Sequence, residues 1–209
     1  MENKMIKIGL TGQSGAGKGM LSEIFEKHGI HCLDTDIVSR LVCGVGMPCT
    51  LELAENFGDD IIKSDGSLDR RALANKVFLA ENKEEKTVLL NKITHRYILA
   101  YADEWLAKQE ESGAVVALVD APVLFESGYD KSCDYIIGVL ADKETRIKRI
   151  IARDCIDRKL AEERIASQKD DAFFIENCSL VLYNDSDFDA LEKAALPYIE
   201  KLKLGVIPT

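Results

Sequence analysis

The 209-residue sequence is poor in histidine, proline and tryptophan, with three, four and one of each, and its six cysteines include no C-x-x-C pair. This scarcity argues against a zinc site and against the disulfide framework of a secreted domain. Each cysteine is expected to be a buried or half-buried thiol in a reducing compartment. The low proline count, together with the lack of any low-complexity tract, argues against linkers and disordered tails.

Basic residues are fewer than acidic ones. The sequence has 27 Lys and Arg and 36 Asp and Glu, so the formal net charge is −9. An acidic chain is poorly suited to general binding of nucleic acid or of membrane surfaces, so an anionic ligand would need a local basic patch. No apolar run reaches membrane-spanning length. We expect one cytoplasmic globular unit, a monomer or weak homo-oligomer, with small-molecule partners and neither nucleic-acid nor membrane partners.

The most informative stretch is glycine-rich and covers residues 9–19, between an apolar run and a helical pattern. It matches G-x-x-x-x-G-K from Gly12 to Lys18, with further glycines at Gly15 and Gly17. Glycines allow successive backbone N–H groups to point at one anion, and the following helix adds its positive dipole end. Strand, loop and helix in this order predict a phosphate-binding loop in which Lys18 reaches the outer phosphates. The alternative is a turn that binds nothing.

The motif fails at its last position, because Gly19 stands where Ser or Thr would bind magnesium, and Met20 follows. Backbone contacts and the Lys18 contact do not depend on that hydroxyl, so the stretch still predicts a nucleoside triphosphate site. Magnesium would then be held by phosphate, water and a distant carboxylate.

Carboxylates follow two of the predicted strands. Asp34 and Asp36 follow the run 30–33, and either one taken alone is most simply a helix N-cap. Beside a phosphate loop, such a carboxylate could instead orient an acceptor hydroxyl and take its proton. Asp120 ends the strand-like run 114–119, as a magnesium-binding Walker-B carboxylate does.

A loop at 44–49 leads into a stretch, 50–111, whose pattern is almost entirely helical. Tyr97, Tyr101 and Trp105 recur there at helical spacing, which is most simply core packing. These aromatic residues would form a substrate wall if the helical block were an insertion over the site.

A basic segment follows Asp142, which is predicted to cap a helix. Arg146, Arg149 and Arg153 lie on one face of that helix because they are three and four residues apart. Interleaved acidic residues favour a solvated helix face. Beside a phosphate loop, the segment fits better a lid whose arginines contact the transferring phosphoryl group.

Strands are expected at 6–11, 30–33, 114–119, 135–140 and 179–183, with helices between them. This alternation predicts an α/β fold with a mostly parallel sheet.

Taken in order, the motifs resemble those of the dephospho-coenzyme A kinase family over nearly the whole chain. The shared elements are Thr11–Lys18; Leu33-Asp34-Thr35-Asp36 with Arg40; Phe57-Gly58; Asp65–Leu73 with Val77-Phe78; Asn91 with His95; Asp120–Glu126; Lys148-Arg149 with Arg153-Asp154; and Ile165–Gln168 before Asn184. Three positions depart from the usual family pattern, namely Gly19-Met20 for Ser-Thr, Arg96 for Pro and Val123 for Leu. Adenylate kinases are similar at Gly15–Gly19 and are active with glycine at the last position.

The resemblance implies a P-loop kinase fold with a five-stranded parallel sheet flanked by helices. The nucleotide-binding core would comprise 1–49, 112–141 and 179–209, with a helical substrate-binding insertion at 50–111 and a helical lid at 142–178. It implies transfer of the γ-phosphoryl group of ATP, with Mg²⁺, to the ribose 3′-hydroxyl of dephospho-CoA, the last step of coenzyme A synthesis.

The resemblance also implies residue roles. The catalytic set would be Lys18, Asp36 as base on the acceptor side, and Arg149 and Arg153 from the lid. ATP would contact Gly12, Gly15, Ala16, Gly17, Lys18, Gly19, Met20 and Asn184, the last near the adenine. Dephospho-CoA would contact Asp36, Arg40, Arg71, His95, Asp120, Pro122, Leu124, Phe125 and Glu126. Asp120 would hold the metal, directly or through water.

Three alternatives remain open at this point. One is another small-molecule P-loop kinase, acting on a nucleoside or nucleoside monophosphate. Another is a homologue that binds ATP but is catalytically weak because of Gly19 and Met20. A GTPase-like switch fits less well, because Asp120 does not begin a D-x-x-G element and 91–94 lacks the final Asp of N-K-x-D.

Overall fold

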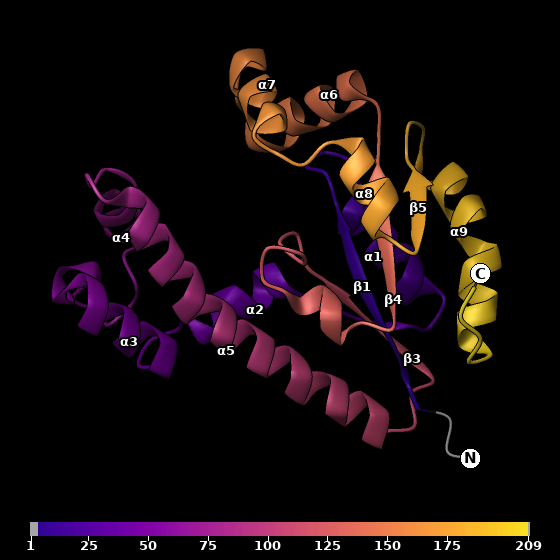
Figure 1. Cartoon of the computed structure of the whole chain (residues 1–209), viewed down its shortest axis with the longest axis horizontal. Coiled ribbons are helices and arrows are strands. Elements are labelled where there is room, and N and C mark those ends of the chain that lie inside the picture. The colour runs from indigo at the N-terminus through magenta and orange to yellow at the C-terminus, as the bar shows by residue number, and fades with distance from the viewer. Residues whose placement is uncertain (1–3, 209) are drawn as a thin grey trace. The chain divides into compact units, whose positions relative to one another are not determined.

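The structure is a computed structural model that describes residues 4–208 (Figure 1). Its strands are β1 (Ile6–Gly12), β2 (His31–Asp34), β3 (Val116–Asp120), β4 (Tyr135–Leu140) and β5 (Leu180–Tyr183). Its α-helices are α1 (Lys18–Lys27), α2 (Thr35–Val42), α3 (Pro48–Phe57), α4 (Arg70–Phe78), α5 (Lys83–Glu111), α6 (Lys143–Asp154), α7 (Arg158–Ala166), α8 (Asp171–Asn177) and α9 (Phe188–Lys203). Two short 3₁₀ helices are η1 (Asp59–Ile61) and η2 (Tyr129–Ser132).

The strands form one five-stranded sheet in the order β2-β3-β1-β4-β5. The pairs of β1 with β3, β1 with β4 and β4 with β5 are parallel, so their carboxyl ends share one edge. The register places Leu10 of β1 beside Asp120 of β3, and Gly12 beside Val139 of β4. The predicted α/β class with a parallel sheet is confirmed, and the glycine loop leaves the sheet between the two neighbours of β1.

The core of this sheet is completed by helices on both faces. On one face, α1 and α9 pack against β1, β3 and β4 through fully buried residues such as Leu21, Phe25 and Ile199. On the other, α8 packs on β4 and β5, and η2 packs on β1. Burial of each such side chain contributes about 1.5–3 kcal/mol to folding. Because β1 is covered on both faces, the loop that follows it has a fixed starting point.

The chain divides into two compact units, and the division falls at Leu33/Asp34 and again within α5. One unit comprises residues 34–105, with α2, α3, η1, α4 and most of α5. The other contains the described residues up to Leu33 and from Leu106 onward, including the glycine loop. Among the helices of residues 4–208, none combines the length and the apolarity that crossing a membrane requires.

The helical unit differs from expectation at its start and along α5. The loop predicted at 44–49 ends earlier, because Pro48 begins α3 at a position where its missing N–H costs no hydrogen bond. The aromatic residues of α5 are not among the buried core residues, since Tyr101 is 38% exposed and Tyr97 and Trp105 are half-buried. The buried residues of that helix are the aliphatic side chains Ile93, Ala102 and Leu106.

Candidate active site

The glycine loop between β1 and α1 has a backbone that favours glycine at three positions. Gly12 has φ 151°, Gly15 has φ 79° and Gly17 has φ 97°, all in the region that favours glycine. A Cβ on Gly12 would collide with the carbonyl oxygen of Val139, and a Cβ on Gly17 would collide with the Asn184 amide. The glycines predicted to shape a phosphate loop therefore also allow it to lie directly against β4 and the end of β5.

Helix α1 begins without a side-chain cap. Its N-cap is Gly17, no side chain accepts from the first-turn N–H groups, and no acidic residue lies in that turn. Other helices are capped by aspartate, for example α6, where Asp142 accepts from the Thr145 N–H at 2.9 Å. Uncapped N–H groups and the positive helix end together suit an anion such as a phosphate.

Lys18, Ser22 and Asp120 meet where α1 faces the end of β3. The Lys18 ammonium forms an ion pair with Oδ1 of Asp120, and the Ser22 hydroxyl donates to Oδ2 at 3.1 Å. Asp120 is only 5% exposed, so its charge needs partners of this kind. The structure thus brings together the loop lysine and the strand-end carboxylate that the sequence predicted separately. Ser22 was not predicted, because nothing in a one-dimensional motif marks it.

Arg146 of α6 braces the loop from the outside. It is 4% exposed, and its guanidinium donates to the Ser14 carbonyl at 3.1 Å and to Oε1 of Gln168 at 2.8 Å. The same Gln168 oxygen accepts from the Ser14 N–H at 3.1 Å. Burial lowers the pKa of Arg146 from its ordinary value. Sequence spacing placed Arg146 on the basic face of its helix but could not show that it points inward.

The two predicted catalytic arginines have different surroundings. Arg149 donates to the carbonyls of Asn184 and Ser186, each at 2.8 Å, which fixes it across the loop that follows β5. Arg153 pairs with Asp154 at 2.7 and 2.9 Å, and hydrogen bonds from Arg153 and Arg164 lower the pKa of Asp154 to about 2. Arg149 is thus held next to the glycine loop, and Arg153 is engaged on its own helix end.

Asn184 joins the glycine loop to the end of β5. Its side-chain amide donates to the Ala16 carbonyl at 2.8 Å, and the residue is 2% exposed. Its backbone N–H donates to Leu140 at 2.8 Å. Asn184 therefore lies against the loop, where its amide contacts the Ala16 carbonyl and the Met20 sulfur, and its predicted contact with the adenine stays a prediction.

The segment 122–126 leaves β3 beside Asp120. Leu124 is completely buried, and a Cβ on Gly9 would touch it, so this residue anchors the segment on β1. Phe125 packs edge to face on Phe173 of α8, with ring centroids 5.0 Å apart. Pro122 is half-buried and Glu126 is exposed. The contacts with the acceptor that were predicted for this segment remain predictions. Because Leu124 is buried, the other residues of the segment are better placed than Leu124 to touch a ligand.

The remaining predicted site residues belong to the helical unit. Asp36 is an exposed residue in the first turn of α2, because Asp34 acts as the N-cap and accepts from the Asp36 N–H at 2.7 Å. Arg40 and Arg71 are exposed on α2 and α4, and His95 is half-buried on α5. The capping role that the sequence left open for either aspartate is filled by Asp34, which leaves the Asp36 carboxylate out of the cap.

The predicted magnesium site rests on one carboxylate, that of Asp120, and stays a prediction. Within residues 4–208 no three His, Cys, Asp or Glu side chains gather as a metal cage. Mg²⁺ commonly takes one or two carboxylates together with substrate phosphates and water. A Cβ at Gly19 would meet nothing within 4 Å, so the loop is open at the position where the motif has a hydroxyl.

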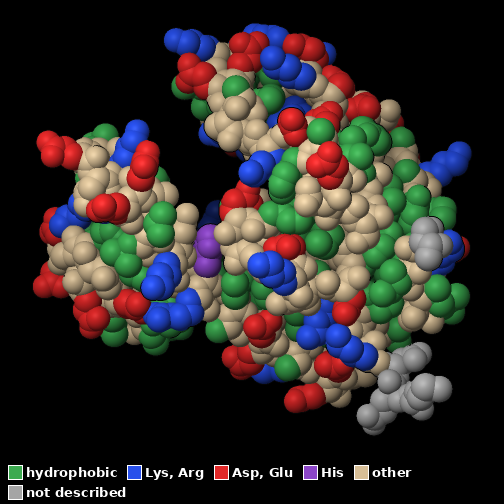
Figure 2. All heavy atoms as spheres, in the orientation of Figure 1, with side chains coloured by type: hydrophobic (Ala, Val, Ile, Leu, Met, Phe, Trp, Pro, Cys, Tyr) green, Lys and Arg blue, Asp and Glu red, His purple; other side chains and the backbone are tan. Residues whose placement is uncertain are grey.

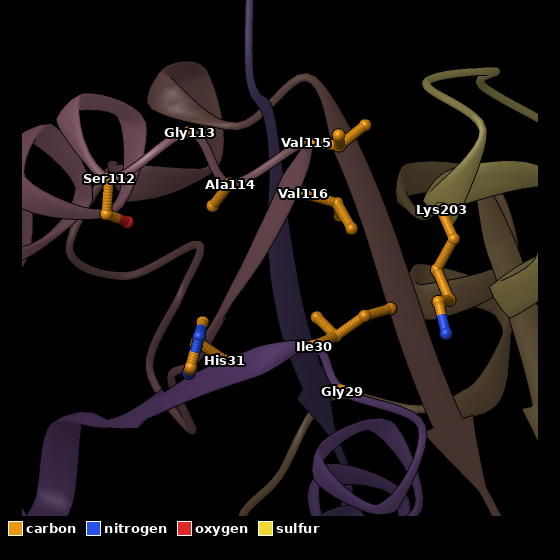
Figure 3. Close-up of a pocket in the computed structure, with 9 residues that line it drawn as sticks. All are labelled: Gly29, Ile30, His31, Ser112, Gly113, Ala114, Val115, Val116 and Lys203. Atoms are coloured by element: carbon orange, nitrogen blue, oxygen red, sulfur yellow. The ribbon is translucent and has the colours of Figure 1, made fainter.

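A separate hollow of about 260 Å³ lies at the other edge of the sheet (Figure 3). It is lined by Ile30, His31 and Val116 near the starts of β2 and β3, and by Lys203 at the end of α9. Ligands of parallel α/β sheets bind at the carboxyl ends of the strands, so this hollow is not part of the loop site.

Acidic and basic side chains are interspersed over the visible face of each unit (Figure 2). The net charge of −9 is therefore not gathered into one acidic patch on this face. Local positive charge at the loop comes from Lys18, Arg146 and Arg149, together with the α1 N-terminus.

A parallel sheet with a G-x-x-x-x-G-K loop after its central strand β1, and a carboxylate at the end of the adjacent strand β3, defines a P-loop kinase. Solved structures share this fold. A Thermus thermophilus protein matches with a TM-score of 0.74 and 26% identity over 95% of this chain and 98% of its own. A shikimate kinase from Bacteroides thetaiotaomicron shares the fold at a TM-score of 0.54 and 16% identity.

The family model for dephospho-CoA kinase matches residues 6–190. A dephospho-CoA kinase from Corynebacterium glutamicum is 36% identical over 95% of this chain and 98% of its own length. One from Fusobacterium nucleatum is 35% identical over 93% and 97%. The chain belongs to the dephospho-CoA kinase family, and it is a phosphotransferase that uses ATP.

Proposed function

We propose that the protein transfers the γ-phosphoryl group of ATP to the ribose 3′-hydroxyl of dephospho-CoA and so forms coenzyme A. The observation that carries this proposal is the convergence of Lys18 and Asp120 beside an uncapped helix start, in a chain of this family. In the reaction a bond forms between the 3′-oxygen and the γ-phosphorus, and the bond to the β-phosphate oxygen breaks. ADP leaves, and the hydroxyl proton must be accepted by a base.

The loop residues would hold the triphosphate. In the proposal, backbone N–H groups between Gly12 and Met20 bind the phosphate oxygens, and Lys18 exchanges Asp120 for the outer phosphates. Asp120, buried and hydrogen-bonded, would then hold Mg²⁺ through water. Magnesium supplies charge neutralisation on the phosphates when it is bound.

Two arginines would stabilise charge on the transferring group. Arg149 is already fixed beside Gly15 and Ala16, with its guanidinium 3.5 Å from each of their carbonyls. Arg153 lies one turn further along α6, and one of its nitrogens is 3.5 Å from the Ser14 hydroxyl. Guanidinium groups positioned near the charge that develops in the transition state increase the rate of phosphoryl transfer strongly.

Each unit carries residues that the family resemblance implies for acceptor binding, and each set is proposed by itself. Asp36, Arg40, Arg71 and His95 are proposed to contact dephospho-CoA from the helical unit. Pro122, Phe125 and Glu126 are proposed to do so from the segment after β3, with Leu124 beneath them. Asp36 is proposed to be the base, since its carboxylate is exposed and lies outside the helix cap.

The function is tested by measuring coenzyme A formation from ATP, magnesium and dephospho-CoA, with AMP, adenosine and shikimate as parallel acceptors. Turnover confined to dephospho-CoA is expected. Turnover with AMP or adenosine would favour a nucleotide kinase instead. ATP binding without turnover on any acceptor would favour a catalytically weak homologue. The cytoplasmic location and the monomeric or weakly associated state remain predictions.

The role of Asp36 is tested by Asp36→Asn. Loss of a positioned base lowers turnover by roughly 10²–10⁴-fold, and ATP affinity should stay nearly unchanged. Thermal unfolding should also be little affected, because Asp34 and not Asp36 caps α2. Unchanged turnover in this variant would remove Asp36 from the mechanism.

A further inference from the structure

The first helical turn after Lys18 carries no hydroxyl. Gly19 is exposed, and a side chain built there would meet nothing within 4 Å. Met20 follows it, and its sulfur accepts from the Asn184 amide at 3.8 Å. The next hydroxyl along α1 belongs to Ser22, one turn beyond Lys18.

Ser22 and Lys18 lie on the same face of α1 because they are four residues apart. That face meets the end of β3, where both residues reach the Asp120 carboxylate. Lys18 pairs with Oδ1, and the Ser22 hydroxyl donates to Oδ2 at 3.1 Å. The carboxylate is therefore contacted through both of its oxygens from one helix.

Lys18 and Ser22 differ in how firmly each is held at Asp120. Lys18 has a long, flexible side chain, and the proposed function requires its ammonium to engage ATP phosphates. Ser22 has a single side-chain torsion before its hydroxyl and is half-buried on the helix. If Lys18 turns toward phosphate, the hydrogen bond from Ser22 to Asp120 does not have to break.

We propose that Ser22 is a positioning residue that fixes the Asp120 carboxylate for Mg²⁺ and so replaces, from one turn further along α1, the missing hydroxyl of residue 19. The Ser22 hydroxyl donates to Oδ2, and Oδ1 is the oxygen that pairs with Lys18. This inference rests on the proposed function, because it assigns Asp120 to magnesium held with ATP.

The test compares ATP binding by isothermal titration calorimetry with magnesium and with EDTA, in wild type and in Ser22→Ala. The variant should weaken binding of Mg·ATP about tenfold, which is about 1.4 kcal/mol, and change binding of metal-free ATP less than twofold. Ser22→Thr, which keeps the hydroxyl, should restore the magnesium effect. Ser112→Ala is the matched control, since the Ser112 hydroxyl donates to the Gln109 carbonyl, at 2.7 Å, just after the end of α5.

A double variant decides whether Ser22 stands in for residue 19. Gly19→Ser combined with Ser22→Ala should recover most of the lost Mg·ATP affinity, because the loop is open where that serine would project. If Ser22→Ala does not fold, Ser22→Cys keeps the volume with a much weaker donor and gives the same comparison.

The possible outcomes distinguish failure of the role of Ser22 from failure of the proposed function. Equal losses with magnesium and with EDTA, or no loss in either, would overturn the role of Ser22 while leaving the ATP site intact. Wild-type protein that does not bind ATP at all would overturn the proposed function first. A loss confined to Mg·ATP, rescued by Thr and by the double variant, is the expected result.

Discussion

The glycine loop depends on individual residues whose conformations are not interchangeable. Gly17 has φ 97° and lies against the Asn184 amide, whereas Gly19 has an ordinary helical φ and open space beside it. Two glycines of one motif, two residues apart, are thus under opposite constraints.

Gly17→Ala is expected to destabilise the protein, and Gly19→Ala is not. A left-handed alanine costs about 1–2 kcal/mol before the collision with Asn184 is counted. For a chain of this length the melting temperature should fall by at least roughly 2–8 °C. Alanine at 19 should leave stability equal or slightly higher, since alanine favours helix over glycine. Differential scanning calorimetry of both variants checks this, and equal melting temperatures would contradict it.

The cysteines should differ widely in reactivity. Burial raises the pKa of Cys32 and of Cys178 to about 12. A hydrogen bond from the Cys49 thiol, 3.6 Å away, lowers the pKa of Cys43 to about 7. Alkylation of Cys43 by iodoacetamide should therefore level off at a lower pH than alkylation of Cys32 and Cys178. Peptide mass spectrometry between pH 6 and 9 measures this. Cys49→Ala should move the Cys43 inflection upward, and an unmoved inflection would refute the assigned cause.

Among the elements, α6 contributes more to the site than its surface charge indicates. Arg146 is buried and ties the helix to the Ser14 carbonyl and to Gln168. Lys148, two residues on, is exposed on the same helix.

Arg146→Met should lower the free energy of unfolding by about 2–4 kcal/mol, because two hydrogen bonds from a charged donor are lost and Gln168 is left underpaired. ATP affinity should fall too, since the loop loses its outer support. Lys148→Met should change neither by much. Urea unfolding and calorimetry on the two variants distinguish them, and equal effects would show that Arg146 does not brace the loop.

The sequence predicted some elements well because their signals are local. Strand β1 and the glycine loop follow from an apolar run and from glycine placement, and both are present. Asp142 caps α6 as predicted, because a cap needs only its own first turn. Pro48 was missed as a helix start, although a proline at the first helical position is itself a local signal.

Contacts between distant segments could not be predicted from periodicity. Arg146, Arg149 and Arg153 share one helix face, yet one is buried, one is fixed on carbonyls and one is paired with its neighbour. Which of them touches the loop depends on how α6 packs. Ser22 was missed for the same reason, since its importance comes from Asp120, which lies 98 residues away in sequence.

At the scale of the whole molecule, ATP should stabilise the fold. A ligand at 100 times its dissociation constant adds about 2.7 kcal/mol, which for this chain length raises the melting temperature by roughly 5–10 °C. Lys18→Ala should lose most of that shift, whatever its own starting stability. Thermal melts with and without ATP and magnesium measure the difference, and a full shift in the variant would show that Lys18 does not bind the triphosphate.

The N-caps have a consequence for charge engineering. Of the α-helices described here, six begin with an aspartate whose side chain accepts a backbone N–H: Asp34, Asp69, Asp142, Asp157, Asp170 and Asp187. Asparagine caps a helix about as well as aspartate does. Exchanging all six would remove six negative charges and move the formal charge from −9 to −3 with every helix start still satisfied. Much of the negative charge of this protein could therefore be removed, and its isoelectric point raised, without a change of fold.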